Sequence, residues 1–217
     1  MASASSALLI ASTFDEHRSA GTTVDDAGLA ALGVANWTDV LAVHDALIAN
    51  SGRSLCGWKV GMNADAAWGA HKQYGLTGPI TGPLFSDVVV KNGGVVGPAA
   101  DLVMAEAEWG FRFAASPVAT GTSGAFVAAD IVAALKEIVV CIEMCGTRFT
   151  NAGSASICQK LADHALNAGV VTGAAFPVGE FILFTVTFCA NPAHDLTCPP
   201  HIYDNISLYD QVSTWAK

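Results

Sequence analysis

Two apolar segments of the sequence, AEAEWGF at 105–111 and VVCIEMC at 139–145, carry three carboxylates between them. Both segments have the length and composition of β-strands. Because residues i and i+2 of a strand point to the same face, Glu106 and Glu108 are expected to project side by side, and Glu143 lies centrally in the second segment. Like charges repel, and glutamates are rarely buried without a partner. The fold must therefore bring solvent, a basic side chain or a cation to these carboxylates.

The donor atoms indicate one such partner. Carboxylate oxygens are the ligands that hard divalent cations such as Mg²⁺, Mn²⁺ or Ca²⁺ prefer, and three of them leave coordination positions open for a substrate. A solvated strand face, or pairing with arginine, accounts for the same residues, so on spacing alone these interpretations stay open. Cys141 and Cys145 flank Glu143 and are interpreted as small core residues.

The charge balance limits the class of ligand. The 217-residue chain has a net charge of −9 and only 10 Lys+Arg, which form no run, so no nucleic-acid partner is expected. A small molecule is the expected partner, and an anionic one would need a metal or local cations beside it. The length fits one domain with a sizeable core.

The thiols and the apolar segments predict a cytoplasmic protein. The six cysteines form no CxxC pair, and the N-terminal MASASSALLIASTF lacks the basic segment of a secretory signal. The longest apolar run, 181–190, has about half of the residues that a membrane span requires. It is interpreted as a buried strand, and no membrane partner is expected.

The hydrophobic periodicity predicts short helices first and strands afterwards. Helices are expected at 5–18, at 38–50 with Thr38 as the cap, at 63–74 and at 127–138. Strands are expected at 57–61, 105–113, 139–145 and 181–189, with a loop at 75–87 and a hairpin at Asn92-Gly93. This order indicates an α+β protein rather than a doubly wound sheet.

Five motifs in a fixed order carry a family resemblance: GWKVGM (57–62), GPLFSDV (82–88), AEAEWGF (105–111), VVCIEMCGTRF (139–149) and LADHALNAGVVTGA (161–174). The chain resembles the 2-keto-4-pentenoate (2-hydroxypenta-2,4-dienoate) hydratases and 4-oxalocrotonate decarboxylases of the fumarylacetoacetate hydrolase superfamily. The resemblance implies N-terminal helices followed by a mixed β-roll. It divides the chain into a helical cap with the first strand (1–80), a β-roll catalytic core (81–190) and a divergent tail (191–217).

The resemblance also implies a set of site residues. Mg²⁺ or Mn²⁺ would be held by Glu106, Glu108 and Glu143. Lys59 and Asp87 would be catalytic, Lys59 near the substrate and Asp87 in proton transfer, while Arg148 and Asp163 would bind substrate. Taken without the family, Lys59 is a surface lysine, Asp87 a turn former and Arg148 the partner of a glutamate, and Asp163 with His164 braces a loop.

The implied chemistry is a lyase reaction on a small 2-oxo acid, whose two oxygens chelate the metal while an enolate is stabilised. Hydration of a 2-hydroxydienoate is preferred, and decarboxylation of the 4-oxalocrotonate type is the alternative. A C–C bond hydrolase is less favoured, because His44 and His71 lie in no recognisable motif. From another class, the chain could be an assembly partner without activity. Expected protein partners are further copies of this chain or a related hydratase or decarboxylase subunit.

The sequence departs from the family near its end. A G-H-P segment and a G-D-x-I-x-T-G strand pair complete the roll in the family, and neither occurs after Gly173. The roll is therefore expected to be incomplete, with unpaired edge strands. In this tail His194, Cys198 and His201 have a spacing loosely like that of zinc ligands, with no evident fourth residue.

Overall fold

The computed structural model describes residues 4–63, 67, 69–94, 102–121, 124, 126–178, 185–186 and 201–202. The chain divides into two compact units, one formed by 1–108 with 141–173 and the other by 109–140 with 174–217. The domain boundaries expected at 80 and 190 stay predictions. Most of the predicted strand at 181–189 and of the tail, including His194 and Cys198, lies outside the described residues.

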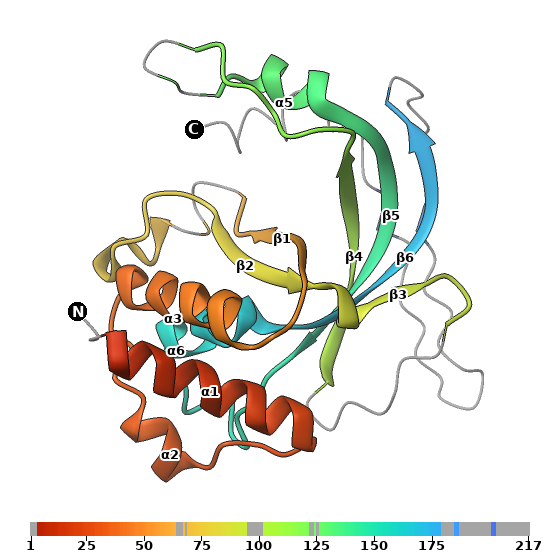
Figure 1. The fold of residues 1–217 in the computed structure, drawn as a ribbon. Coiled ribbons are helices and arrows are strands. Elements are labelled where there is room, and N and C mark those ends of the chain that lie inside the picture. Colours follow the sequence, from red (N-terminus) through yellow and green to blue (C-terminus); the bar gives the residue numbers. More distant parts are fainter. Residues whose placement is uncertain are drawn as a thin grey trace. The chain divides into compact units, whose positions relative to one another are not determined.

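The helices are α1 (Ala4–Ala20), α2 (Asp26–Ala31), α3 (Trp37–Asn50), α5 (Ala128–Ala134) and α6 (Ile157–Ala162), with 3₁₀ turns η1 (Lys72–Tyr74), η2 (Ser86–Val88) and η4 (His164–Leu166). The strands are β1 (Leu55–Gly61), β2 (Ile80–Phe85), β3 (Val89–Lys91), β4 (Leu102–Phe113), β5 (Leu135–Gly146), β6 (Asn167–Pro177), β7 (Thr185–Val186) and β8 (His201–Ile202). Helices thus come first and most strands later, which confirms the α+β class (Figure 1).

In the part of the chain that the structure describes, the strands form three sheets. β1 pairs with β2 in antiparallel fashion, β7 pairs with β8, and a four-stranded sheet has the order β3-β6-β5-β4. Within the last sheet β3 runs parallel to β6, so the strands of the fold are mixed in direction. Among the described residues, no helix combines the length and apolarity needed to cross a bilayer.

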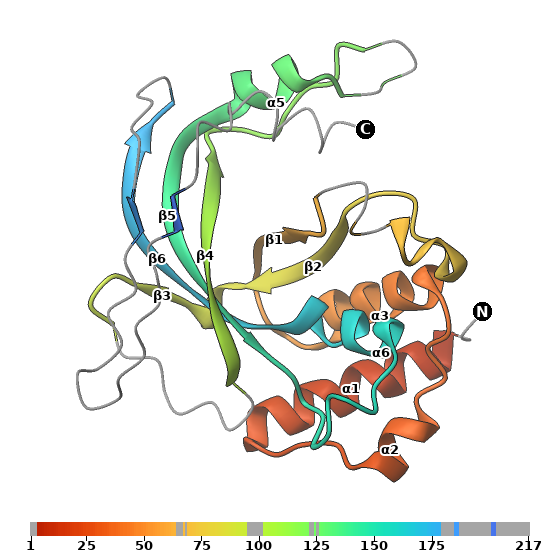
Figure 2. The same cartoon turned by 180° about the vertical axis from the view of Figure 1, so that it is seen from behind.

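The core of the first unit is helical. α1 buries Ala7, Ile10 and Phe14 at helical spacing, and packs against α3, which in turn packs against α6 (Figures 1 and 2). Phe14 is fully buried and meets the ring of Phe149 edge-on, with ring centroids 5.7 Å apart. The predicted helix at 5–18 is confirmed, and α3, which packs on it, also contacts α6 and β2.

The cap of α3 differs from the prediction. The helix begins at Trp37, and the side chain of Asn36, not Thr38, accepts the backbone N–H of Asp39 at 3.1 Å. Asp39 in turn accepts the N–H of Ala35 at 3.0 Å. Asn36 takes the cap because a side-chain oxygen there reaches the third residue of the helix, whereas Thr38 already lies inside the first turn.

The segment 75–87, expected to be a loop, contains β2. Its glycines and prolines indicated turns, but the glycine at position 82 instead allows β2 to pack closely against η4. A Cβ at Gly82 would lie 2.7 Å from both the Cβ of Ala165 and the carbonyl oxygen of His164. Pro83 is tolerated because it lies opposite Trp58 in a sheet of only two strands. The prediction failed because the contacts that require these residues come from a distant part of the chain.

Replacing Gly82 by alanine is expected to destabilise the fold by about 1–3 kcal/mol, because the added methyl overlaps rigid backbone of η4 rather than a flexible side chain. Denaturant unfolding followed by circular dichroism measures the effect. Gly33→Ala is the matched control, since a Cβ there meets no atom within 4 Å. Equal stabilities of the two variants would contradict the close packing of β2 on η4.

One further element prediction was wrong, and another was correct only in part. The hairpin at Asn92-Gly93 is absent: a turn does follow β3, with Gly93 at φ +80°, but β3 pairs with the distant β6 and not with the next strand. The helix expected at 127–138 ends at Ala134, and Leu135 already begins β5. Of the helix expected at 63–74, the described residues show helical positions at 67 and 69 and the turn η1, which ends at Gly75 as predicted.

Candidate metal centre

The structure brings two of the three predicted carboxylates together in the first unit. Glu106 on β4 and Glu143 on β5 approach one another and the thiol of Cys145. One ligand atom from each residue lies within 4.8 Å of the other two. Glu143 and Cys145 are two residues apart on β5 and share a face of the strand. This cluster lies on the sheet and not at the helical core.

Glu143 is buried and is held by two neighbours. The ammonium of Lys59 on β1 lies 2.7 Å from its Oε1, and the side-chain amide of Asn167 donates to the same oxygen at 2.9 Å. Only 3 % of Glu143 is exposed, so these contacts replace the water that its charge would otherwise bind. Lys59 is therefore no surface lysine: its side chain is 15 % exposed and points at the carboxylate.

Glu108 belongs to the same electrostatic environment. Its pKa is raised to about 7, first by desolvation and then by the charges of Glu143 and Glu106, while Lys59 lowers it. The residue as a whole is exposed, although its carboxyl is partly desolvated. A carboxyl that is crowded by two others and compensated by a single lysine indicates an excess of negative charge at this place.

A divalent cation suits this donor set. Glutamate oxygens from two strands converge, a thiol lies beside them, and the charge of Lys59 cannot neutralise all of the carboxylates. Glu106, Glu108 and Glu143 could hold such an ion, which would offset the repulsion that adds to desolvation in raising the pKa of Glu108. Their role as ligands stays a prediction.

Asn167, which the sequence analysis did not single out, is positioned by a strained turn. His164, Ala165 and Leu166 all have positive φ angles, between 52° and 64°, a conformation that side chains disfavour. The carbonyl oxygen of Asn167 accepts Arg18 at 2.7 Å, and its side chain is thereby directed at Glu143. No local sequence pattern indicates this contact, because every partner is distant in the chain.

Arg148 and Asp163 form an ion pair in the interior. Both side chains are fully buried, and the backbone N–H of Arg148 also donates to Asp163 at 2.8 Å. Burial alone would raise the pKa of Asp163, but the guanidinium of Arg148 lowers it to about 2. Their substrate-binding role stays a prediction. The geometry gives them a structural task, since they join the end of β5 to the turn before β6.

Asp87 faces Arg53 in a two-pronged salt bridge. Arg53 donates its Nε to Oδ2 at 2.9 Å and its Nη2 to Oδ1 at 3.0 Å, while its guanidinium carbon lies 4.2 Å from the ring centre of Phe85. Asp15 is a further partner of Arg53, at 3.4 Å. The side chain of Asp87 is 54 % exposed, and its catalytic role stays a prediction.

Two buried histidines predict how the fold responds to acid. Burial lowers the pKa of His44 from 6.5 to about 4, although its Nε2 donates to the carbonyl of Leu161, and burial likewise lowers the pKa of His164 to about 3. Between pH 6.5 and 4 the unfolded chain binds these protons and the folded chain does not. Stability should therefore fall as the pH falls through this window, by about 3 kcal/mol for His44.

Urea unfolding at a series of pH values measures this slope. His44→Gln keeps a donor for the Leu161 carbonyl but removes the titrating group, so its stability should depend less steeply on pH. Identical slopes for the two proteins between pH 6.5 and 4 would contradict the assignment of a neutral, buried His44.

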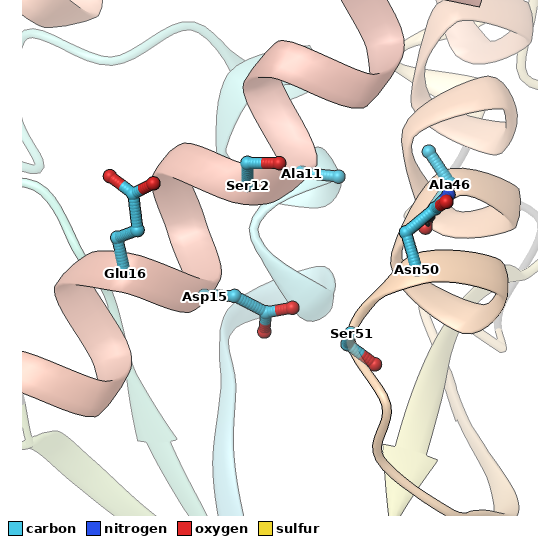
Figure 3. A pocket seen from close by; sticks show the side chains of 7 residues that line it. All are labelled: Ala11, Ser12, Asp15, Glu16, Ala46, Asn50 and Ser51. Carbon is cyan, nitrogen blue, oxygen red and sulfur yellow. Dashed lines mark hydrogen bonds between the residues drawn. The ribbon is translucent and has the colours of Figure 1, made fainter.

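A pocket lies elsewhere, between α1 and the end of α3 (Figure 3). Asp15 and Glu16 line it from α1, and Asn50 and Ser51 from the end of α3. None of the predicted site residues lines this pocket. The candidate site is therefore defined by converging side chains and not by a depression of this kind.

Comparison with known proteins finds similar folds among solved structures. No protein-family model and no curated protein matches the chain. Among solved structures it is similar to the 4-oxalocrotonate decarboxylase from Pseudomonas putida G7 complexed with magnesium and adipate, at a TM-score of 0.66, and to the same enzyme complexed with calcium and acetate, at 0.65. Each match has 19% identity and covers 84% of this chain and 68% of the decarboxylase chain. The likeness confirms the expected fold class.

Proposed function

We propose that this chain is a metal-dependent lyase acting on a small 2-oxo acid, within the fumarylacetoacetate hydrolase superfamily. The observation that carries the proposal is the convergence of Glu106 and Glu143, with Lys59 beside them and Glu108 in the same field. These residues come from three strands of a fold that a magnesium-bound decarboxylase shares.

The carboxylates have the task of holding the ion. Glu106, Glu108 and Glu143 would bind Mg²⁺ or Mn²⁺, and Asn167 would keep Glu143 in one orientation. The bound cation would supply Lewis-acid stabilisation of the negative charge that develops on a 2-oxo group.

The basic and acidic side chains have separate tasks. Lys59 lies against Glu143 and adds a fixed positive charge where an anionic substrate would approach. Asp87 would move protons between solvent and the substrate carbon, and Arg53 would hold its carboxylate in one orientation. Arg148 and Asp163 would contribute to substrate binding by fixing the backbone around the site.

Hydration of 2-hydroxypenta-2,4-dienoate is the first reaction that we propose, and decarboxylation of a 4-oxalocrotonate-type acid is the second. The second is favoured by one specific observation, the fold shared with a 4-oxalocrotonate decarboxylase. Both reactions pass through the same kind of enolate, so the same carboxylates and lysine serve either of them.

Turnover of both substrates by the full chain tests the proposal. Loss of the dienol absorbance reports hydration, and release of CO₂ reports decarboxylation. Either activity should vanish with a chelator and return with Mg²⁺ or Mn²⁺. If the chain binds the ion but converts neither acid, the lyase proposal fails, and an assembly role beside a related subunit is supported instead. We propose that the chain is a homo-oligomer, which light scattering tests separately.

A further inference from the structure

We propose that Cys145 is a ligand of this site, and that its thiolate gives the cluster a preference for a borderline divalent ion such as Zn²⁺ or Co²⁺ over Mg²⁺. The inference rests on the metal site of the proposed function and concerns which ion it takes. It arises from the position of the thiol: the ligand atoms of Cys145, Glu106 and Glu143 all lie within 4.8 Å of one another.

The surroundings of Cys145 distinguish it from an ordinary core thiol. Only 4 % of the residue is exposed, yet its Sγ lies 3.3 Å from Oε2 of Glu106 and donates a hydrogen bond to it. A small hydrophobic residue gains nothing from two carboxylates as neighbours. Cys158 shows the contrast, because it is 1 % exposed and belongs to the apolar cluster around α6.

Binding of a divalent cation at Cys145 would release the proton of its thiol. Without an ion the thiol keeps its hydrogen and shares it with Glu106. On binding, the S–H bond breaks, the proton leaves to solvent, and the sulfur lone pair binds the cation. Glu106, Glu143 and the thiolate then balance one divalent ion and the ammonium of Lys59, and an ionised Glu108 leaves the cluster with one net negative charge.

The softness of sulfur decides the preference. Thiolates bind zinc and the later first-row ions well, whereas Mg²⁺ favours oxygen ligands and keeps its water. A site of the three glutamates alone would show a smaller preference for these ions, because carboxylate oxygens also suit Mg²⁺. A thiolate ligand in addition to the carboxylates therefore predicts tight binding of Zn²⁺ and Co²⁺, with Mg²⁺ bound more weakly.

Cobalt provides a direct readout. Titration of the metal-free full chain with Co²⁺ should produce a near-ultraviolet sulfur-to-cobalt charge-transfer band, and Zn²⁺ should displace it. Cys145→Ser should lose the band and bind Zn²⁺ about 100-fold more weakly, with unchanged affinity for Mg²⁺. Cys158→Ser is the control for loss of a buried thiol and should keep the band.

A second variant tests whether misfolding, and not loss of the sulfur ligand, removes the charge-transfer band. Cys145→Asp replaces sulfur by oxygen, so it should lose the band while its affinity for Mg²⁺ rises. A charge-transfer band that persists in Cys145→Ser, or an unchanged metal preference in Cys145→Asp, would overturn the inference. Binding of Mg²⁺ or Mn²⁺ without any cobalt–sulfur band would also overturn it, while the metal site of the proposed function would stand. Absence of all divalent binding would overturn both.

Discussion

Replacing Glu106 or Glu108 by glutamine is expected to abolish metal-dependent turnover and to weaken Mn²⁺ binding by about 100-fold or more. Glutamine has nearly the same shape but no charge, so the site loses the attraction that holds the cation. The fold should be unaffected, because Glu108 is crowded by Glu143 and Glu106 and loses repulsion when it is neutral. Titration calorimetry and the two substrate assays measure the effect.

Glu137→Gln is the matched control for these variants. Glu137 lies on β5 like Glu143, but it pairs with Arg112 instead of the cluster. Its replacement should leave both the affinity for Mn²⁺ and turnover unchanged. If Glu108→Gln retains full activity at saturating Mg²⁺, its assignment as a ligand is wrong.

The second large effect is expected at the buried ion pair. Asp163→Asn should lower the free energy of unfolding by about 3–5 kcal/mol, because it leaves the charge of Arg148 buried without its counter-ion. The same carboxylate also accepts Thr147 at 3.2 Å, so one replacement weakens several contacts at once. Denaturant unfolding measures the loss.

A double replacement separates the charge from the packing. Arg148→Met combined with Asp163→Leu removes both charges, and should recover a large part of the stability that Asp163→Asn loses. Glu137→Gln, at a partly exposed pair with Arg112, should change stability by no more than about 1 kcal/mol. A loss below this value for Asp163→Asn would show that the pair is not needed to join β5 to the turn before β6.

The sequence predicted those parts of the fold whose pattern is local. The spacing of Ala7, Ile10 and Phe14 specifies a helix face, and the alternation around Glu106 and Glu108 specifies a strand. These predictions hold because the side chains that enforce them are neighbours in sequence. That Glu143 would meet Glu106 was implied by the family resemblance, because spacing alone left a solvated face or an arginine partner open.

The parts that could not be predicted depend on distant contacts. Gly82 indicates a turn in isolation, and only the backbone of His164 explains why it lies in a strand. Asn92-Gly93 favours a hairpin locally, but β6 offers β3 a parallel partner. Leu135 continues a helical pattern and is nevertheless taken into β5. In each case tertiary pairing outweighed local propensity.

The candidate site shows the same division. Lys59 and Glu143 could be predicted as site residues from the sequence, but their 2.7 Å contact could not. No sequence motif indicated that Asn167 would contact Glu143 or that Arg53 would contact Asp87. Cys145 did have one, because it lies two residues after Glu143 and therefore on its face of β5. It was interpreted as a core residue because thiols in apolar strands usually are.

We propose that carboxylates from β4 and β5 share one divalent cation. Electron paramagnetic resonance of free Mn²⁺ during titration with the full chain tests it most directly, since bound Mn²⁺ loses its sharp six-line signal. We expect one Mn²⁺ to bind per chain, with binding removed by Glu106→Gln and kept by Glu137→Gln. A free-Mn²⁺ signal that the protein leaves undiminished, or equal binding by both variants, would contradict it.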